Sequence, residues 1–396
     1  MAEQTPLFQS HQAEAERVLH ERAAHAEAHR PGASLGGLED APAPEYIPWG
    51  PQDAEAEEAS SMLATLGSVE AEYAMLRRHR GRIDDATRGT IHVRGADAAD
   101  FLDRMLTQKL AGFAAGDVAA SFLTDRKGRI LAELLLAGTD DGILIDVDVH
   151  QVDVVVETLD GFLFSEDVQL ENVTSAWYRL GVHGPAAPEL FDESIEPMRG
   201  SSQTVDGCAV HVVRRDRIGS PGFLLFVRRD DAATIWQALD CGTSAWYAFN
   251  MARIEAGTPL CNIDFGPGSL PHETTLVPEC VSFTKGCYPG QEIVARMQHL
   301  GQPSQVLRGL RLQGDALPVA GSQVMAIEDG GGMGQPIGVV TSSSLSPMLG
   351  STPLALAMLR TKKSEPGVMV RVHDEGEPCD AVVGPLAAWP IEQEGD

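Results

Sequence analysis

The segment FTKGCYPGQE at residues 283–292 is the stretch that most constrains the fold and the chemistry of this chain. Apolar residues follow it at helical spacing, namely Ile293, Val294 and Met297, and Gly301 stands where such a helix would end. This pattern predicts a glycine-bounded loop that leads directly into the N-terminus of a helix.

The cysteine of this loop is a candidate nucleophile. Cys287 lies two residues after Lys285 and shortly before the expected helix. The positive end of a helix and a nearby ammonium group both favour a thiolate, and glycines at 286 and 290 let the backbone approach a ligand or a partner closely. We therefore interpret Cys287 and Lys285 as catalytic candidates. A small cysteine that only packs in the core is the alternative that the sequence leaves open.

Length and charge exclude several classes of protein. The chain has 396 residues, whereas single domains usually stop growing near ~250 residues, so we expect more than one packed unit. Lys and Arg number 30 and Asp and Glu number 57, which gives a net charge of −27. Nucleic acid and anionic membranes repel such a surface, so we expect neither as a partner.

Cysteine usage and hydropathy point to a compartment. The six cysteines form neither a dense disulfide framework nor a C-x-x-C motif, so we expect free thiols and no metal site. The first 30 residues lack the apolar core of a signal peptide, and no run of 18 apolar residues occurs. We therefore expect a cytoplasmic protein.

Composition and residue patterning divide the chain into units. Residues 1–70 are rich in Ala, Glu and Pro and are expected to form a flexible, loosely helical extension, with an amphipathic helix near residues 60–77. Residues 71–302 alternate strand and helix patterns irregularly, which is typical of an α+β fold. Residues 303–390 carry short strands broken by Gly, Pro and Ser, which predict a small β-barrel, and residues 391–396 are a tail.

The α+β region contains recognisable local patterns. We expect a strand followed by a helix capped by Asp97, then a hairpin whose turn contains Gly128. The sequence predicts strands at 90–94, 121–124, 130–137, 143–149, 179–182, 208–213 and 223–227, and helices at 152–159, 188–191, 231–239 and 244–255.

The motif KGCYPGQE at residues 285–292 resembles the signature of the YgfZ-type folate-binding proteins, which are relatives of the glycine-cleavage T-protein. The resemblance extends through VHGP at 182–185, RIEAG at 253–257 and PHE at 271–273, and it covers roughly residues 80–390. It implies a T-protein-like ring of three subdomains around a central folate cavity, with a C-terminal β-barrel. Residues 71–302 would then be the folate-binding α+β region.

The same resemblance implies a function. It implies a tetrahydrofolate-binding accessory protein, expected as a monomer, that supports iron–sulfur cluster assembly or repair and has iron–sulfur client or assembly proteins as partners. A folate-dependent aminomethyltransferase or demethylase is the alternative, and a thiol oxidoreductase that uses Cys287 is a third reading. The residues expected to contact folate are Arg253, Trp246, Tyr288 and Gln291. A structural ion pair of Arg253 is left open.

Departures from the T-protein pattern bear on the choice of branch. T-proteins carry an Asp-Asp pair where Ala132 and Glu133 stand here, so the carboxylate that assists their aminomethyl transfer is missing or displaced. They also carry a pterin-reading glutamate at the position of Leu224 and an arginine at that of Phe249. These departures favour the YgfZ-type reading over glycine cleavage.

Arginines gather around one predicted hairpin of this acidic chain. Charge-assisted hydrogen bonds from such a group can hold the carboxylates of a folate tail. A solvated basic face that balances nearby acids is the alternative. The arginines are Arg214, Arg215, Arg217, Arg228 and Arg229.

Overall fold

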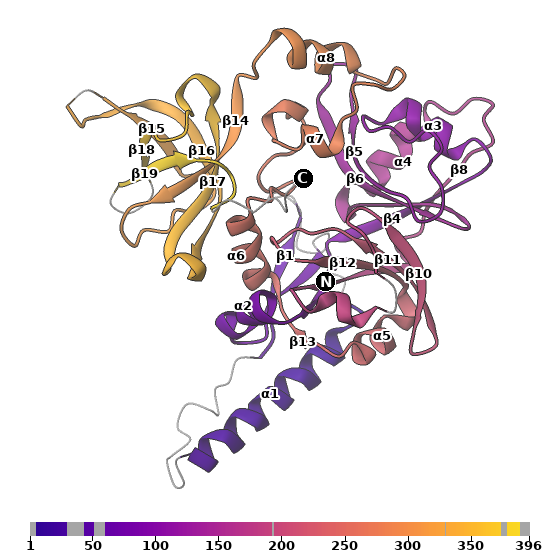
Figure 1. The fold of residues 1–396 in the computed structure, drawn as a ribbon, viewed down its shortest axis with the longest axis horizontal. Helices are drawn as coiled ribbons and strands as arrows, with labels where there is room; N and C mark the ends of the chain where they lie inside the picture. Colours follow the sequence, from indigo (N-terminus) through magenta and orange to yellow (C-terminus); the bar gives the residue numbers. More distant parts are fainter. Residues whose placement is uncertain are drawn as a thin grey trace.

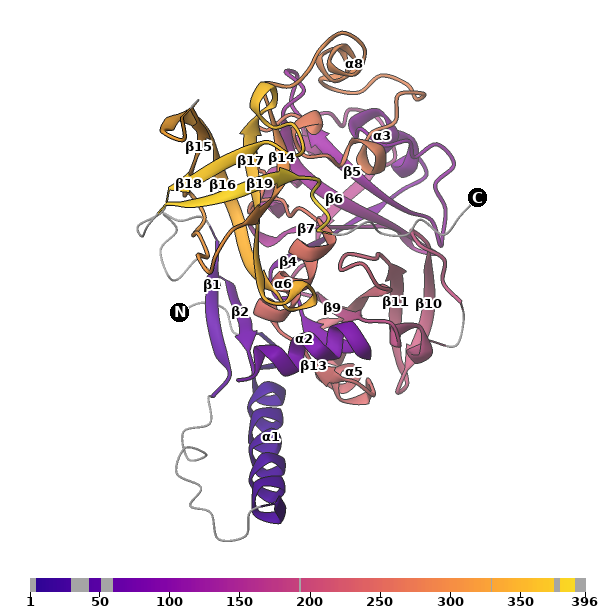
Figure 2. The same ribbon diagram turned by 60° about the vertical axis from the view of Figure 1, so that its left-hand side comes forward.

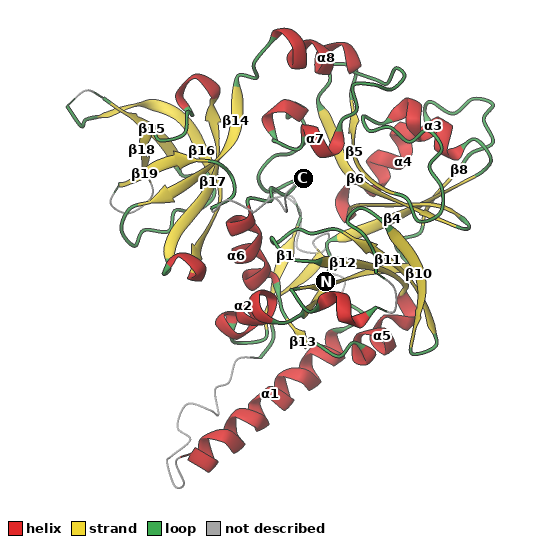
Figure 3. Cartoon of the chain, viewed as in Figure 1, coloured by secondary structure: helices red, strands yellow, loops and turns green. Residues whose placement is uncertain are grey.

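The computed structural model describes residues 5–29, 43–50, 60–191, 194–328, 330–373 and 378–388. These residues form two larger sheets, a closed barrel and a two-stranded N-terminal sheet. The barrel lies on one side of the molecule and the two larger sheets lie on the other (Figure 1). Helices line the outer edges of the sheets and the seam beside the barrel (Figure 3). This arrangement is the expected mixed α+β fold.

The first large sheet has the order β5-β6-β7-β4-β8. Its consecutive hairpins confirm the strands expected in this region. Two helices, α3 (Ala98–Met105) and α4 (Val152–Asp160), cover one of its faces with a buried apolar core that includes Phe101, Leu102 and Leu159. The strands are β4 (Arg88–Arg94), β5 (Val118–Thr124), β6 (Ile130–Thr139), β7 (Gly142–Asp148) and β8 (Gln169–Asn172).

The second large sheet has the order β10-β11-β12-β9-β3-β13. Its core gathers around Trp236 of α5 (Ala232–Ala238). The helices α2 (Val69–Arg78) and α6 (Trp246–Ala256) pack against each other beside it. The strands are β3 (Gly81–Asp84), β9 (Trp177–His183), β10 (Gly200–Val205), β11 (Cys208–Arg214), β12 (Gly222–Arg228) and β13 (Gly242–Thr243).

The closed barrel confirms the expected C-terminal β-barrel. Its strands follow the order β14-β17-β16-β15-β18-β19, and inward residues such as Leu310, Val324 and Leu359 fill it. The unit boundaries near residues 70, 302 and 390 stay a prediction. The strands are β14 (Gln305–Leu312), β15 (Gln323–Ile327), β16 (Met333–Ser346), β17 (Thr352–Arg360), β18 (Met369–His373) and β19 (Cys379–Gly384).

The described part of the N-terminal segment contains a long helix whose start is buried against the body. Helix α1 (Phe8–His29) projects from the body, but its first turns are anchored beside α5 (Figure 2). Leu7 is fully buried, and the ring of His11 lies 5.3 Å from that of Trp236. Glu14 accepts a hydrogen bond from Arg82 at 2.8 Å. The mostly polar composition of this segment gives no sign of these few buried residues.

The helix expected near residues 60–77 needs correction. Residues 60–65 form a strand, β2 (Ser60–Thr65), which pairs with β1 (Glu45–Trp49). The helix α2 starts only at Val69, after Ser68, whose side chain accepts a hydrogen bond from the backbone N–H of Ala71. The N-cap and its following acidic turn set this start, as is usual for helix N-termini.

Candidate functional site

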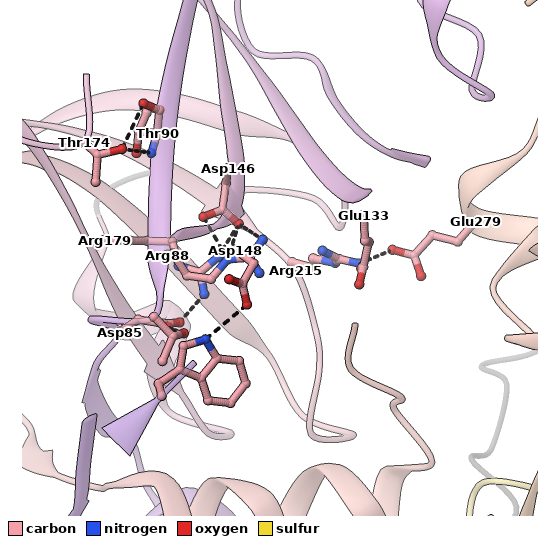
Figure 4. A network of polar contacts seen from close by, with 12 residues as sticks. Asp85, Arg88, Thr90, Glu133, Asp146, Asp148, Thr174, Arg179, Arg215 and Glu279 are labelled. Atoms are coloured by element: carbon pink, nitrogen blue, oxygen red, sulfur yellow. Dashed lines mark hydrogen bonds and ion pairs between the residues drawn. The ribbon is translucent and has the colours of Figure 1, made fainter. Parts of the chain in front are cut away.

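A buried network of charges joins the two large sheets. Arg88 of β4 donates to Asp146 of β7 with Nη2 at 3.0 Å from Oδ2. Arg179 of β9, in the other sheet, donates both to Asp146 and to Asp85. Figure 4 shows the guanidinium groups of Arg88 and Arg179 converging on this carboxylate. Since the side chain of Asp146 is only 1% exposed, the network belongs to the interior of the molecule.

Glu133 of β6 extends this network with an ionised carboxylate. Arg215 donates to Glu133 Oε1 at 3.0 Å and to Glu279 Oε1 at 3.1 Å, so that the two carboxylates flank one guanidinium (Figure 4). Burial raises the pKa of Glu133, but the charges of Arg215 and Arg217 outweigh it and hold that pKa below its ordinary value. The neighbouring Ala132 packs in the core beneath α3 and α4. Of this pair of positions, only residue 133 therefore faces the other sheet.

Arg217 stands beside this pair and has no hydrogen-bonded partner in the described part of the chain. It is 8% exposed, and it makes no hydrogen bond or ion pair with any residue that the structure describes. Burial and the charge of Arg215 lower the pKa of Arg217 to about 10. Together with Arg215, Arg217 lines a cavity of about 350 Å³.

A row of rings runs beside the charged network. The ring centroids of Trp49 and Trp246 lie 5.9 Å apart, those of Trp246 and Phe249 lie 6.3 Å apart, and those of Phe249 and His183 lie 5.4 Å apart. The indole N–H of Trp49 donates to Asp148 at 3.1 Å. Both tryptophans and Phe249 are half-buried.

His183 closes this row as a neutral imidazole. Burial, aided by the charges of Arg217 and Arg179 and opposed by Asp85, lowers the pKa of His183 to about 3. Its Nδ1 has no hydrogen-bond partner in the described part of the chain. The charged network and the row of rings therefore meet at His183, and together they form the central site.

The KGCYPGQE loop has the expected form. Helix α8 (Gln291–Leu300) follows Gly290, which has φ +82°. A Cβ on Gly290 would lie 2.3 Å from the carbonyl oxygen of Asp125 in the β5–β6 turn, and Thr124 donates to the carbonyl of Pro289 at 2.7 Å. The loop is thus docked on the β5–β6 hairpin, and Cys287 is exposed within it.

Lys285 has a different environment from the one expected. Its side chain is 1% exposed, and its ammonium donates to the carbonyls of Asp103, Leu106 and Gln108, the last two at 2.7 and 2.9 Å. These carbonyls close the C-terminal end of α3, where a cation satisfies otherwise unpaired acceptors. The geometry therefore favours a structural role for Lys285 rather than the activation of Cys287.

The expected folate contacts lie on two separate elements. Trp246 and Arg253 belong to α6, and Tyr288 and Gln291 belong to the loop and the start of α8. Arg253 is fully buried and donates to Asp264 Oδ2 at 2.5 Å, which favours the structural ion pair. Tyr288 is buried, burial raises its pKa to about 12, and its hydroxyl lacks a partner among the described residues. Gln291 is half-buried at the start of α8. Of these residues, Trp246 alone lies in the row of rings.

Two features of the central site were not identified from the sequence. The orientation of Glu133 follows from strand alternation, which was a usable signal once β6 was assigned. Arg217 has no hydrogen-bonded carboxylate among the described residues because other arginines bind the nearby ones. No local pattern in the sequence indicates this. The sequence already places Arg217 among the arginines that can hold a folate tail, and the tertiary structure adds that its Nε lacks a hydrogen-bond partner among the described residues.

Three further features concern possible metal ligands, the thiols and the helices in the described part of the chain. Its His, Cys, Asp and Glu side chains form no group of three or more able to hold a metal ion. Cys280 is fully buried, and burial raises its pKa, while Cys287 is exposed. Among the same residues, none of the helices combines the length and the apolar character needed to span a membrane.

Comparison with known proteins identifies the family. Residues 48–285 match the GCVT N-terminal domain, and residues 305–388 match the glycine cleavage T-protein C-terminal barrel domain. A probable aminomethyltransferase of Natronomonas pharaonis is 28% identical over 336 residues, covering 82% of this chain and 92% of that protein. The aminomethyltransferase of Streptomyces coelicolor is 28% identical over 344 residues, covering 81% and 90%.

A solved structure supports the same fold. The crystal structure of glycine cleavage system aminomethyltransferase T from Bartonella henselae matches with a TM-score of 0.75 at 22% identity, covering 87% of this chain and 94% of that chain. The T-protein-like architecture with its terminal barrel is therefore confirmed. The comparisons support the T-protein superfamily rather than its YgfZ branch in particular.

Proposed function

The chain belongs to the glycine cleavage T-protein family, and on this premise we propose that it is a tetrahydrofolate-dependent one-carbon transferase of the aminomethyltransferase or demethylase type. This was the alternative reading of the sequence. Relatives named aminomethyltransferase support it. The observation that carries it is Glu133, a buried carboxylate that accepts a hydrogen bond from Arg215 and that the charges of Arg215 and Arg217 keep ionised.

The residues of the central site fit tetrahydrofolate in part. Bound tetrahydrofolate supplies the nitrogen atoms that accept a one-carbon unit. Trp246, Phe249 and His183 offer ring faces and an unpaired ring nitrogen to its flat heteroaromatic part. Leu224 is buried in the apolar core and Phe249 is uncharged, so the pterin contacts of T-proteins cannot be made by these two residues. Other side chains of this chain must read the pterin edge.

Glu133 supplies the charge that such a transfer requires. A carboxylate that stays ionised in a desolvated site can stabilise a cationic amine or accept its proton. Arg215 fixes the position of the carboxylate, since its guanidinium also binds Glu279 at 3.1 Å. In this proposal, Glu133 takes the place of the carboxylate with which T-proteins assist aminomethyl transfer.

The test measures tetrahydrofolate-dependent release of ammonia from the aminomethylated glycine-cleavage carrier protein. We expect Glu133→Gln to lower kcat by about 100-fold or more, the usual scale for a general base, while the Kd for tetrahydrofolate from calorimetry stays within about threefold. Glu133→Asp should retain part of the rate. Glu365→Gln, which removes an exposed carboxylate near the barrel, serves as the matched control.

Two outcomes would contradict the proposal at different levels. If the parent protein releases no ammonia above the uncatalysed rate from this donor, and transfers no methyl group from N-methylated amino acids to tetrahydrofolate, the one-carbon transferase assignment is wrong. If the parent is active and Glu133→Gln is equally active, the assignment stands and the role of Glu133 is wrong.

The iron–sulfur accessory role implied by the resemblance of the KGCYPGQE motif is a second candidate, to which the comparisons lend no support. Cys287 is exposed on a loop that is docked firmly against the β5–β6 turn, where it can meet a client or assembly protein. Restoration of iron–sulfur enzyme activity in cells that lack the protein, compared for the parent and Cys287→Ser, tests this role. A cytoplasmic location and a monomeric state belong to the same set of proposals.

A further inference from the structure

The arginines of the charged network differ in one respect. Arg88, Arg179 and Arg215 each donate to at least one carboxylate. Arg217 is as buried as they are, yet it donates to no group that the structure describes. A buried charge is costly unless it is paired and hydrogen-bonded. Among the residues that the structure describes, Arg217 therefore lacks the hydrogen-bonded partner that its burial requires.

The nearby acids are already engaged by other groups. Arg179 and Arg88 hold Asp85 and Asp146, and Arg215 holds Glu133 and Glu279. Asp148 accepts from the indole of Trp49 and from the backbone N–H of His150. Asp216, which follows Arg215 in the chain, accepts from Arg214 and from the backbone N–H of Gly222. A partner for Arg217 must come from outside this group of acids.

The cavity beside Arg217 provides room for such a partner. Its volume of about 350 Å³ lies at the lower end of the range of roughly 300–1,000 Å³ for small-molecule sites. It thus accommodates an amino acid or one arm of a larger ligand. Its lining includes Arg215, Arg217, Thr258 and Thr275. It also includes Asp216 and Glu279, whose carboxylates already accept hydrogen bonds from Arg214 and Arg215.

We propose that Arg217 and this cavity form a carboxylate-binding site. The rigid fork of a guanidinium matches a carboxylate with two parallel hydrogen bonds. Two ligands carry this chemistry, namely a free amino acid and the glutamyl end of a folate. The carboxylate site itself does not depend on the transferase activity, whereas the folate source rests on the proposed folate binding.

The first experiment measures ligand binding to the full chain. N-(4-aminobenzoyl)-L-glutamate, which is the tail of folate without its pterin, and glycine are titrated by calorimetry into the parent, Arg217→Gln, Arg217→Lys and Arg360→Gln. Arg360 is an exposed arginine at the end of β17, so its substitution controls for net charge. We expect Arg217→Gln to weaken binding at least tenfold, Arg217→Lys to weaken it less, and Arg360→Gln to leave it unchanged.

The two probes separate the sources of the carboxylate. Arg217-dependent binding of N-(4-aminobenzoyl)-L-glutamate alone identifies the folate tail, and Arg217-dependent binding of glycine alone identifies a free amino acid. Either result supports the site. Binding of neither probe to the parent, binding that survives in Arg217→Gln, or equal displacement by inorganic phosphate would overturn it.

A second measurement tests the missing partner directly. Without ligand, Arg217→Gln should melt at the same temperature as the parent or higher, because burial and repulsion from Arg215 outweigh the attraction of Arg217 to Glu133. The carboxylate probe that binds should raise the melting temperature of the parent and not of Arg217→Gln. A fall of several degrees in the unliganded variant would show that Arg217 is a structural residue and would contradict the proposal.

Discussion

At the scale of single residues, Lys285 and Cys287 have opposite environments although they lie two positions apart. The ammonium of Lys285 is enclosed and satisfies three carbonyls at the end of α3. The thiol of Cys287 is exposed. Lys285 therefore has a structural role, because it binds the loop to α3, whereas Cys287 remains accessible to a partner.

This separation predicts opposite effects of two substitutions. Lys285→Met should lower the free energy of unfolding by at least about 2 kcal/mol, because it leaves buried carbonyls without donors. Cys287→Ser should change the free energy of unfolding by less than about 0.5 kcal/mol, as is usual for an exposed residue. Urea titration of both variants measures these changes. Equal losses in the two variants would contradict the assignment of separate roles.

Alkylation gives an independent measure of Cys287. Iodoacetamide should label Cys287 faster than the buried Cys261 and Cys280, whose pKa values burial raises. Labelling rates depend on both thiolate content and access. Mass spectrometry of the labelled peptides at neutral pH follows the rates, with Cys287→Ser as the control for peptide assignment. Slower labelling of Cys287 than of Cys280 would contradict its exposure.

At the scale of elements, α1 is attached to the body through its first turns. The hydroxyl of Thr5 donates to Asp84 of β3 at 2.6 Å, and His11 Nδ1 lies 2.8 Å from the hydroxyl of Tyr46 in β1. Helix α1 therefore links β3 to β1, the strand that carries Trp49 to the row of rings. A segment outside the matched family domains thus supports the wall of the central site.

Leu7 is the apolar part of this anchor. It is fully buried in the core around Trp236, so Leu7→Ala should cost about 2–4 kcal/mol of local stability, in the usual range for a truncated core leucine. Hydrogen exchange of the α1 amides should become faster in this variant. Gln12→Ala, at an exposed position of the same helix, should leave exchange unchanged, and equal exchange in both variants would contradict the anchor.

The elements show which features the sequence could and could not predict. Strand alternation and glycine turns predicted the β5–β6–β7 hairpins and the barrel, because these patterns are local. The same local reasoning extended a helix back over residues 60–65, which form β2 instead. It also judged the N-terminal segment by its average polarity. The anchoring of Leu7 and the isolation of Arg217 depend on contacts between distant segments, which composition and spacing do not report.

At the scale of the whole molecule, one turn of α6 connects the barrel to the body. Arg253 binds Asp264, whose Oδ1 accepts hydrogen bonds from Thr341 and Ser342 of β16 at 2.8 and 2.6 Å. Glu255 accepts from Tyr73 of α2 at 2.5 Å and from Ser346 of β16 at 2.6 Å. The RIEAG motif thus fixes the barrel against the α+β region.

His183 links the central site to the stability of the whole molecule through pH. Its pKa is lowered to about 3 by burial and by nearby arginines, whereas an unperturbed histidine titrates near ~6.5. Between these values the unfolded chain binds more protons than the folded chain. The contribution of His183 is therefore fully present above about pH 6.5 and is lost as pH falls toward 3, with a slope of up to about 1.4 kcal/mol per pH unit.

Replacement of His183 by Gln should remove this part of the pH dependence, because an amide does not titrate. Urea unfolding at several values between pH 7.5 and 4.5 measures the free energy of unfolding of the parent and of His183→Gln. Below about pH 6.5 the free energy of unfolding of the parent should fall progressively relative to that of His183→Gln. Other titrating groups, including the buried His11, affect both proteins alike and cancel in the difference. His373→Gln, at an exposed position of β18, should run parallel to the parent over the whole range. A constant difference between the parent and His183→Gln would show that the imidazole gains its proton in the folded state as readily as in the unfolded one, and would remove the basis for placing a neutral His183 beside Arg217 and Arg179.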